Sequence, residues 1–198
     1  MSPTTDLGVR ENSRLTALTG LVLFVLLALE GITILQLQSM IVLHFVIGTL
    51  LVAPVLLKLA TTGYKIVRYY TGVPAYVQEG PPPIIRRLLG PVVIVTSIGL
   101  FGSGVMLAIV GPKQIGSWLF FHKAFFVLWF MAMALHVLMH LGGMINGFLD
   151  EYFVAKKKLL PGRGRRGLAL LGTLAVGALL GAWALGQSHV WQGIFVGH

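Results

Sequence analysis

The feature that most constrains this chain is a series of five apolar stretches, each long enough to cross a lipid bilayer. They cover residues 14–35, 40–60, 88–110, 117–145 and 167–186. A helix of about 20 apolar residues spans the hydrocarbon core, where the backbone finds no hydrogen-bond partner outside its own helix or a closed barrel. The sequence therefore predicts an all-α integral membrane helical bundle, with residues 1–198 forming a single membrane domain.

Composition supports this fold class and excludes others. Of the 198 residues, 56% are hydrophobic and only 11% are charged, and cysteine is absent. Soluble domains carry about 25% charged residues, and disordered chains are polar and poor in aromatic residues. A soluble globule and a disordered chain are both excluded, and so are disulfides, thiolate catalysis, iron–sulfur clusters and cysteine-type zinc sites.

The basic residues indicate how the chain lies in the membrane. There are 15 Lys and Arg residues against 6 Asp and Glu residues, a net charge of +9. Thirteen of the 15 fall on one side of the predicted spans, and only Lys113 and Lys123 fall on the other. The positive-inside rule then places the N-terminus in the cytoplasm and the C-terminus outside. The charge is explained by topology and by attraction to anionic lipid, so we expect a multi-pass protein of the plasma (inner) membrane with no nucleic-acid partner.

The loop over residues 61–87 is the sizeable cytoplasmic segment between spans. We expect the second helix to continue through Tyr70, until Gly72 and Pro74 end it, and the prolines at 81–83 to be extended. Its tyrosines and cations are typical of an interfacial belt, and they also suit a docking surface for a cytoplasmic redox partner.

The fifth span carries a pair of small residues and no ionisable side chain. Gly177 and Gly181 are four residues apart, a spacing that favours close contact between helices. We expect a packing role for this span, with an oligomer interface as one form of it. His189 and His198 follow the span on the outer side, where we expect them to be solvated.

Four histidines lie inside predicted spans, where ionisable residues tend to mark function. His122, His136 and His140 share one face of the fourth span, because 14 residues fall only about 40° short of four full turns. His122 and His136 are about 21 Å apart along the helix axis. His44 lies about one turn inside the second span, at the same outer depth as His122. Two imidazoles facing each other across a bundle suit a six-coordinate haem iron, so we expect His44 and His122 to ligate a haem b.

Aromatic and small residues near this level fit a porphyrin. The aromatic residues of the fourth span offer flat apolar surface, and the small residues of the third span would let a flat ring approach a backbone. The aromatic set is Phe121, Phe125, Phe126, Trp129 and Phe130, and the small set is Gly99, Gly102, Ser103 and Gly104.

A second, inner site is suggested by His136. The position 14 residues after His44 is Lys58, so His136 could ligate an inner haem with Lys58 as an unusual partner, bind a quinone, or only form a hydrogen bond. His140, one turn further in, could meet a haem propionate or the cytoplasmic interface.

Two charged residues near the outer surface have two interpretations each. Lys123 could pair with a haem propionate or extend to the lipid headgroups. Glu30, near the outer end of the first span, could take protons in quinone chemistry or lie at the interface.

The segments LHFVIG, with His44, and HKAFFVLWFMAMALHVLMH, with His122 and His136, resemble the di-haem cytochrome b membrane subunits. That family includes the gamma subunit of formate dehydrogenase and the cytochrome b subunit of nickel–iron hydrogenase. The segments RYYTG and GPPP are similar to actinobacterial cytochrome b-like membrane proteins. The resemblance covers residues 14–145. It implies an outer haem on His44 and His122, and His136 as one ligand of an inner haem.

One departure from the family concerns the inner haem. The family takes its other inner ligand from a histidine in the first span, and residues 14–35 contain none. One haem b is therefore expected and two are conceivable. The resemblance implies electron transfer between a partner oxidoreductase and the quinone pool.

Two alternatives stay open at this point. The first is a small membrane oxidoreductase that acts directly on quinone, superoxide or a ferric chelate with the same histidines. The second is a non-redox metal-binding or structural subunit. The second is disfavoured because the spans lack the carboxylates that accompany histidine in divalent-metal sites.

Overall fold

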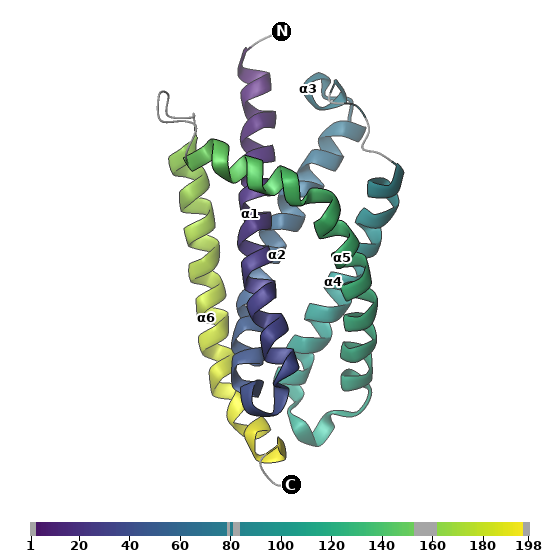
Figure 1. The fold of residues 1–198 in the computed structure, drawn as a ribbon, viewed down its shortest axis with the longest axis vertical. Coiled ribbons are helices and arrows are strands. Elements are labelled where there is room, and N and C mark those ends of the chain that lie inside the picture. The colour runs from purple at the N-terminus through teal and green to yellow at the C-terminus, as the bar shows by residue number, and fades with distance from the viewer. Residues whose placement is uncertain (1–2, 79, 81–83, 153–161, 196–198) are drawn as a thin grey trace.

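The computed structural model describes residues 3–78, 80, 84–152 and 162–195, which are almost entirely helical (Figure 1). Each long helix contains a segment apolar enough to cross a membrane. The predicted all-α membrane bundle is confirmed. The long helices are α1 (Pro3–Leu35), α2 (Leu37–Tyr70), α4 (Ile84–Val110), α5 (Gly116–Tyr152) and α6 (Arg163–Phe195), with a short α3 (Pro74–Val77) and a 3-10 turn η1 (Pro112–Gln114).

The helices extend well beyond the predicted spans. Helix α2 leaves the predicted span at residue 60 and continues to Tyr70, where it ends as expected. Gly72 there adopts a φ of 76°, which favours glycine, and Pro74 begins α3. The predicted extended prolines at 81–83, and His198, lie outside the described residues.

Helices α1, α2, α4 and α5 form a ring of four (Figure 1). Helices α1 and α2 form one closely packed pair, since only Gln36 separates them, and α4 and α5 form another. The ring closes through contacts of α1 with α5 and of α2 with α4. We refer to the end of the bundle near the N-terminus as the inner end and to the opposite end as the outer end, following the orientation predicted from the charges.

Helix α6 packs on the outside of this ring, mainly against α2. Two glycines allow the close approach. A Cβ on Gly177 would lie 2.5 Å from the Leu50 carbonyl oxygen, and one on Gly181 would lie 3.2 Å from the Val46 carbonyl oxygen. The small-residue pair predicted to favour helix contact therefore seats α6 on α2 within one chain.

Large apolar side chains cover the outside of the bundle. Leu35, Leu88 and Leu138 are each at least 70% exposed, as expected for residues that contact lipid. Buried hydroxyls bond to their own helix instead, as Thr19 does to the Leu15 carbonyl and Thr96 to the Val92 carbonyl. This arrangement satisfies polar groups internally where lipid cannot.

Candidate functional site

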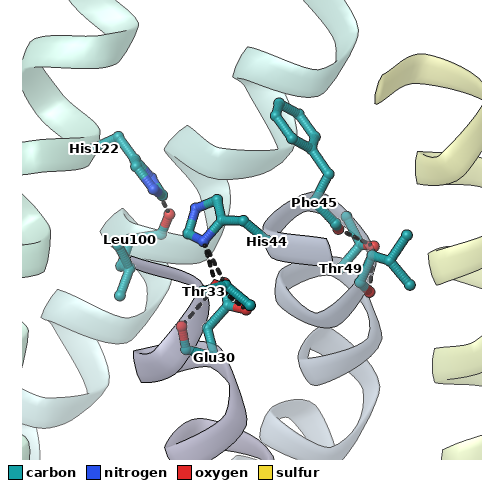
Figure 2. Close-up of polar contacts among 8 residues, drawn as sticks. Glu30, Thr33, His44, Phe45, Thr49, Leu100 and His122 are labelled. Atoms are coloured by element: carbon teal, nitrogen blue, oxygen red, sulfur yellow. Dashed lines mark hydrogen bonds and ion pairs between the residues drawn. The ribbon is translucent and has the colours of Figure 1, made fainter. Parts of the chain in front are cut away.

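The structure brings His44 of α2 and His122 of α5 together across the interior of the ring (Figure 2). Their ring centres are 6.2 Å apart, and the ring planes are nearly perpendicular, at 79°. The two histidines that the sequence places at one depth therefore face each other from opposite helix pairs.

A buried carboxylate holds the ring of His44. Its Nδ1 lies 2.8 Å from Glu30 Oε1 on α1, and Glu30 is only 8% exposed. The Thr33 hydroxyl lies 3.3 Å from the same Nδ1 and donates to the Glu30 backbone carbonyl at 2.7 Å (Figure 2). A histidine that donates its Nδ1 proton to a carboxylate keeps an unprotonated Nε2, which is the form that ligates a metal.

Gly48 makes room for that carboxylate. It lies one turn after His44 on α2, and a Cβ there would be 3.1 Å from Glu30 Oε1. The sequence left Glu30 between proton transfer and an interfacial position, and its contact with His44 was missed. The signal was available, because Glu30 is an acid inside a span at the outer level, where a ligating histidine needs an acceptor.

A backbone carbonyl holds the ring of His122. Its Nδ1 lies 3.2 Å from the Leu100 carbonyl oxygen and 3.2 Å from the Ser103 hydroxyl, both on α4. A carbonyl oxygen can only accept, so the Leu100 contact places the His122 proton on Nδ1. The Ser103 hydroxyl donates to the Gly99 carbonyl at 2.6 Å and can accept from the same N–H. The Nε2 of His122 is therefore left unprotonated as well, and both imidazoles are orientated by their other nitrogen.

The small residues of α4 differ in what lies beside them. Phe125 fills the space beside Gly99, so that a Cβ there would overlap its ring. A Cβ on Gly104 would lie 3.1 Å from His122 Cε1, and Gly102 has no neighbour within 4 Å of that position. Gly99 and Gly104 thus admit side chains of α5, whereas Gly102 has open space beside it. The approach of a flat cofactor to these residues stays a prediction.

The aromatic residues near His122 lie partly between helices and partly on the outside of the bundle, and their contact with a porphyrin stays a prediction. Trp129 is buried and donates its indole N–H to Ser97 Oγ at 3.0 Å, which joins α5 to α4. Phe121 and Phe130 are 45% and 58% exposed on the outside of the bundle. Most of this aromatic surface therefore packs helices together or faces lipid.

The inner level has a different arrangement. His136 and His140 stack on each other on α5, with ring centres 4.3 Å apart, and His140 Nδ1 donates to the His136 carbonyl at 2.8 Å. The ammonium of Lys58 donates to the Thr16 carbonyl of α1 at 2.6 Å. The inner level thus offers two imidazoles from one helix, whereas the outer level offers one from each of two facing helices.

Two cations flank these levels. Arg86, which sequence reasoning did not connect to the inner level, donates to the carbonyl of Met139, the residue before His140, at 3.1 Å. Lys123 is exposed beside His122, and its pairing with a propionate stays a prediction.

The separation of the outer pair would suit two imidazoles that bind one metal ion between them. An imidazole nitrogen binds a first-row metal at about 2 Å, and the ring centre lies about 1 Å behind it, so two imidazoles on opposite sides of one metal have centres about 6 Å apart. The observed separation of 6.2 Å matches this value. Since a porphyrin supplies four nitrogens itself, two facing imidazoles complete the donor set of a haem iron. His44 and His122 therefore fit a haem.

Comparison with protein-family models, with curated proteins and with solved structures finds no match for this chain.

Proposed function

We propose that this chain is a b-type haem protein that transfers electrons in the membrane, with one haem held by His44 and His122. The single observation that carries the proposal is the pair of facing imidazoles, 6.2 Å apart, each with its Nδ1 already bonded. Such a pair can ligate without further rearrangement of its hydrogen bonds. When bound, the haem supplies a one-electron redox centre.

The residues of the chain supply position and electrostatics. Glu30 gives His44 a negatively charged acceptor, whereas Leu100 gives His122 a neutral one. A carboxylate acceptor increases the electron density that an imidazole can donate, so His44 is the stronger donor of the two. The carboxylate also offsets positive charge on the metal in a region of low dielectric constant.

One haem is proposed, rather than the two that the family resemblance implies. His136 and His140 lie on the same helix and stack on each other, and the ammonium of Lys58 is engaged with α1. An inner haem on His136 would need a second ligand from across the bundle.

The proposed membrane and redox partners are based on the resemblance to cytochrome b subunits and on the apolar surface of the bundle. We propose a multi-pass protein of the plasma (inner) membrane that exchanges electrons between a partner oxidoreductase and the quinone pool. Reduction of the haem by a quinol in liposomes that hold only this chain would test the quinone step. Failure of every quinol to reduce a haem that dithionite does reduce would contradict it.

A reduced-minus-oxidised absorption spectrum, with haem quantified per chain, tests haem binding. We expect one haem per chain, lost in His44→Ala and in His122→Ala and retained in His136→Ala. His189→Ala is the matched control, since His189 is an exposed histidine on α6. Full haem content in the His44→Ala protein would contradict the proposal.

A further inference from the structure

Helix α6 inserts a buried tryptophan at the outer end of the bundle. Trp191 is only 4% exposed, and its indole N–H has no hydrogen-bond partner within the part of the chain that the structure describes. A buried indole N–H is normally bonded, and an unbonded one calls for an explanation such as a ligand, an ion or a water molecule.

Hydrophobic residues of α2 and α4 pack against this indole. Trp191 forms a buried cluster with Ile41 of α2 and Leu107 of α4, and its ring centre lies 5.4 Å from that of Phe45. The partly buried residues packed on the cluster are Leu37, Val42, Phe45, Ile115 and Leu119, all hydrophobic. These hydrophobic side chains carry no oxygen, and no other acceptor bonds the indole N–H within the described part of the chain.

The position of the cluster relates it to the proposed haem site. Ile41 precedes His44 by three residues on α2, and Leu107 follows Ser103, which contacts His122, by four residues on α4. Both steps lead toward the outer end, by about one helical turn. Trp191 thus lies between α2 and α4, one turn outward from the facing imidazoles.

We infer that Trp191 donates its indole N–H to a propionate carboxylate of the haem held by His44 and His122. This inference rests on the proposed function. A haem between those histidines brings an edge with two carboxylates, and an outward-facing propionate would reach the level of Trp191. A carboxylate is also a stronger acceptor for an N–H group than a neutral oxygen.

The fifth span would then have a second role besides packing. The sequence indicated packing without a part in chemistry, because no ionisable residue lies inside it. Helix α6 still packs on α2 through its glycines, but its outer end would also close one edge of the haem site. Trp191 would be a positioning residue that fixes the orientation of the haem, with no contact to the iron.

The test compares haem loss from Trp191→Phe and from the unsubstituted protein. Phenylalanine keeps most of the apolar volume and removes the N–H. Each detergent-purified holoprotein is mixed with excess apomyoglobin, and the transfer of haem is followed by absorption. We expect about tenfold faster loss from Trp191→Phe, as for a lost hydrogen bond to a charged group. Trp183→Phe is the matched control, because Trp183 is 41% exposed on the same helix.

A modified haem separates the propionate from other acceptors. Both proteins are also reconstituted with the dimethyl ester of haem, in which neither propionate carries a charge. We expect the difference in loss rate between Trp191→Phe and the unsubstituted protein to shrink severalfold, because the ester carbonyl can accept only the weaker, neutral hydrogen bond. Circular dichroism and the thermal midpoint show whether Trp191→Phe has kept its fold.

The outcomes distinguish the bond between Trp191 and a propionate from haem binding as such. A full difference that persists with the ester haem would overturn the inference and assign the indole to an ordered water or another acceptor. Equal loss from Trp191→Phe and from the unsubstituted protein would overturn it too, with the haem proposal untouched. An unsubstituted protein that holds no haem would overturn the proposed function and this inference together.

Discussion

Replacing Glu30 by glutamine should raise the reduction potential of the proposed haem. Glutamine has nearly the same shape and can still accept the proton of His44 Nδ1 through its amide oxygen, but it carries no negative charge. The carboxylate strengthens His44 as a donor and so favours the ferric state over the ferrous state. Its removal should therefore make the haem easier to reduce, while the haem itself stays bound.

The magnitude follows from the geometry of the contact. The Oε1–Nδ1 distance is 2.8 Å, and the carboxylate is 11% exposed, so solvent screens the interaction little. A hydrogen bond to a charged group exceeds a neutral one by about 1 to 1.5 kcal/mol. If that difference acts on the ferric state alone, the midpoint potential rises by about 40 to 60 mV for a one-electron couple.

A spectroelectrochemical titration of the purified proteins measures this shift. Glu11→Gln is the matched control, because it makes the same chemical change on the same helix at the inner end, where Glu11 pairs with Arg165 at 3.1 Å. A midpoint potential that is unchanged or lower in Glu30→Gln, with haem content and fold preserved, would refute the reasoning. An equal rise in the control would trace the shift to overall charge instead.

Two glycine substitutions test the packing. Gly99→Ala should lower the free energy of unfolding by about 1 to 3 kcal/mol, because its Cβ would overlap Phe125, whereas Gly102→Ala should change it little. Gly177→Ala should reach the upper part of that range, since its Cβ would meet the carbonyl oxygen of Leu50 at 2.5 Å and a backbone cannot move aside as a side chain can. Unfolding in mixed micelles measures all three, and equal stability of the Gly99 and Gly102 variants would contradict the packing described.

Hydropathy predicts the membrane helices well and their ends poorly, for a physical reason. Hydropathy reports which residues tolerate hydrocarbon, and a helix can continue into water without being apolar. Helix α6 therefore extends from Arg163 to Phe195, although its apolar stretch covers only 167–186. The end of α2 was predictable because it depends on local chemistry, a glycine with positive φ at Gly72 followed by a proline.

It was predictable that His44 and His122 face each other. The apolar length of each span sets the depth of its histidine in the membrane, and the helical period sets the face of the helix on which it lies. Their hydrogen-bond partners were predictable only in part. The sequence shows Glu30 as an acid inside a span at the outer level, but which side chain it contacts depends on how the helices are rotated about their axes. Glu30 reaches His44 from α1, and Trp191 reaches the outer end from α6. Neither contact leaves a periodic pattern in the sequence.

Electron paramagnetic resonance of the ferric protein tests the central claim most directly. Two axial imidazoles give a low-spin ferric haem, and nearly perpendicular ring planes give it a strongly anisotropic signal. With ring planes at 79°, His44 and His122 predict that signal in the purified protein and its loss in the His122→Ala variant. A high-spin ferric signal in the unsubstituted protein would show that the two histidines do not both ligate the iron, and would contradict the account.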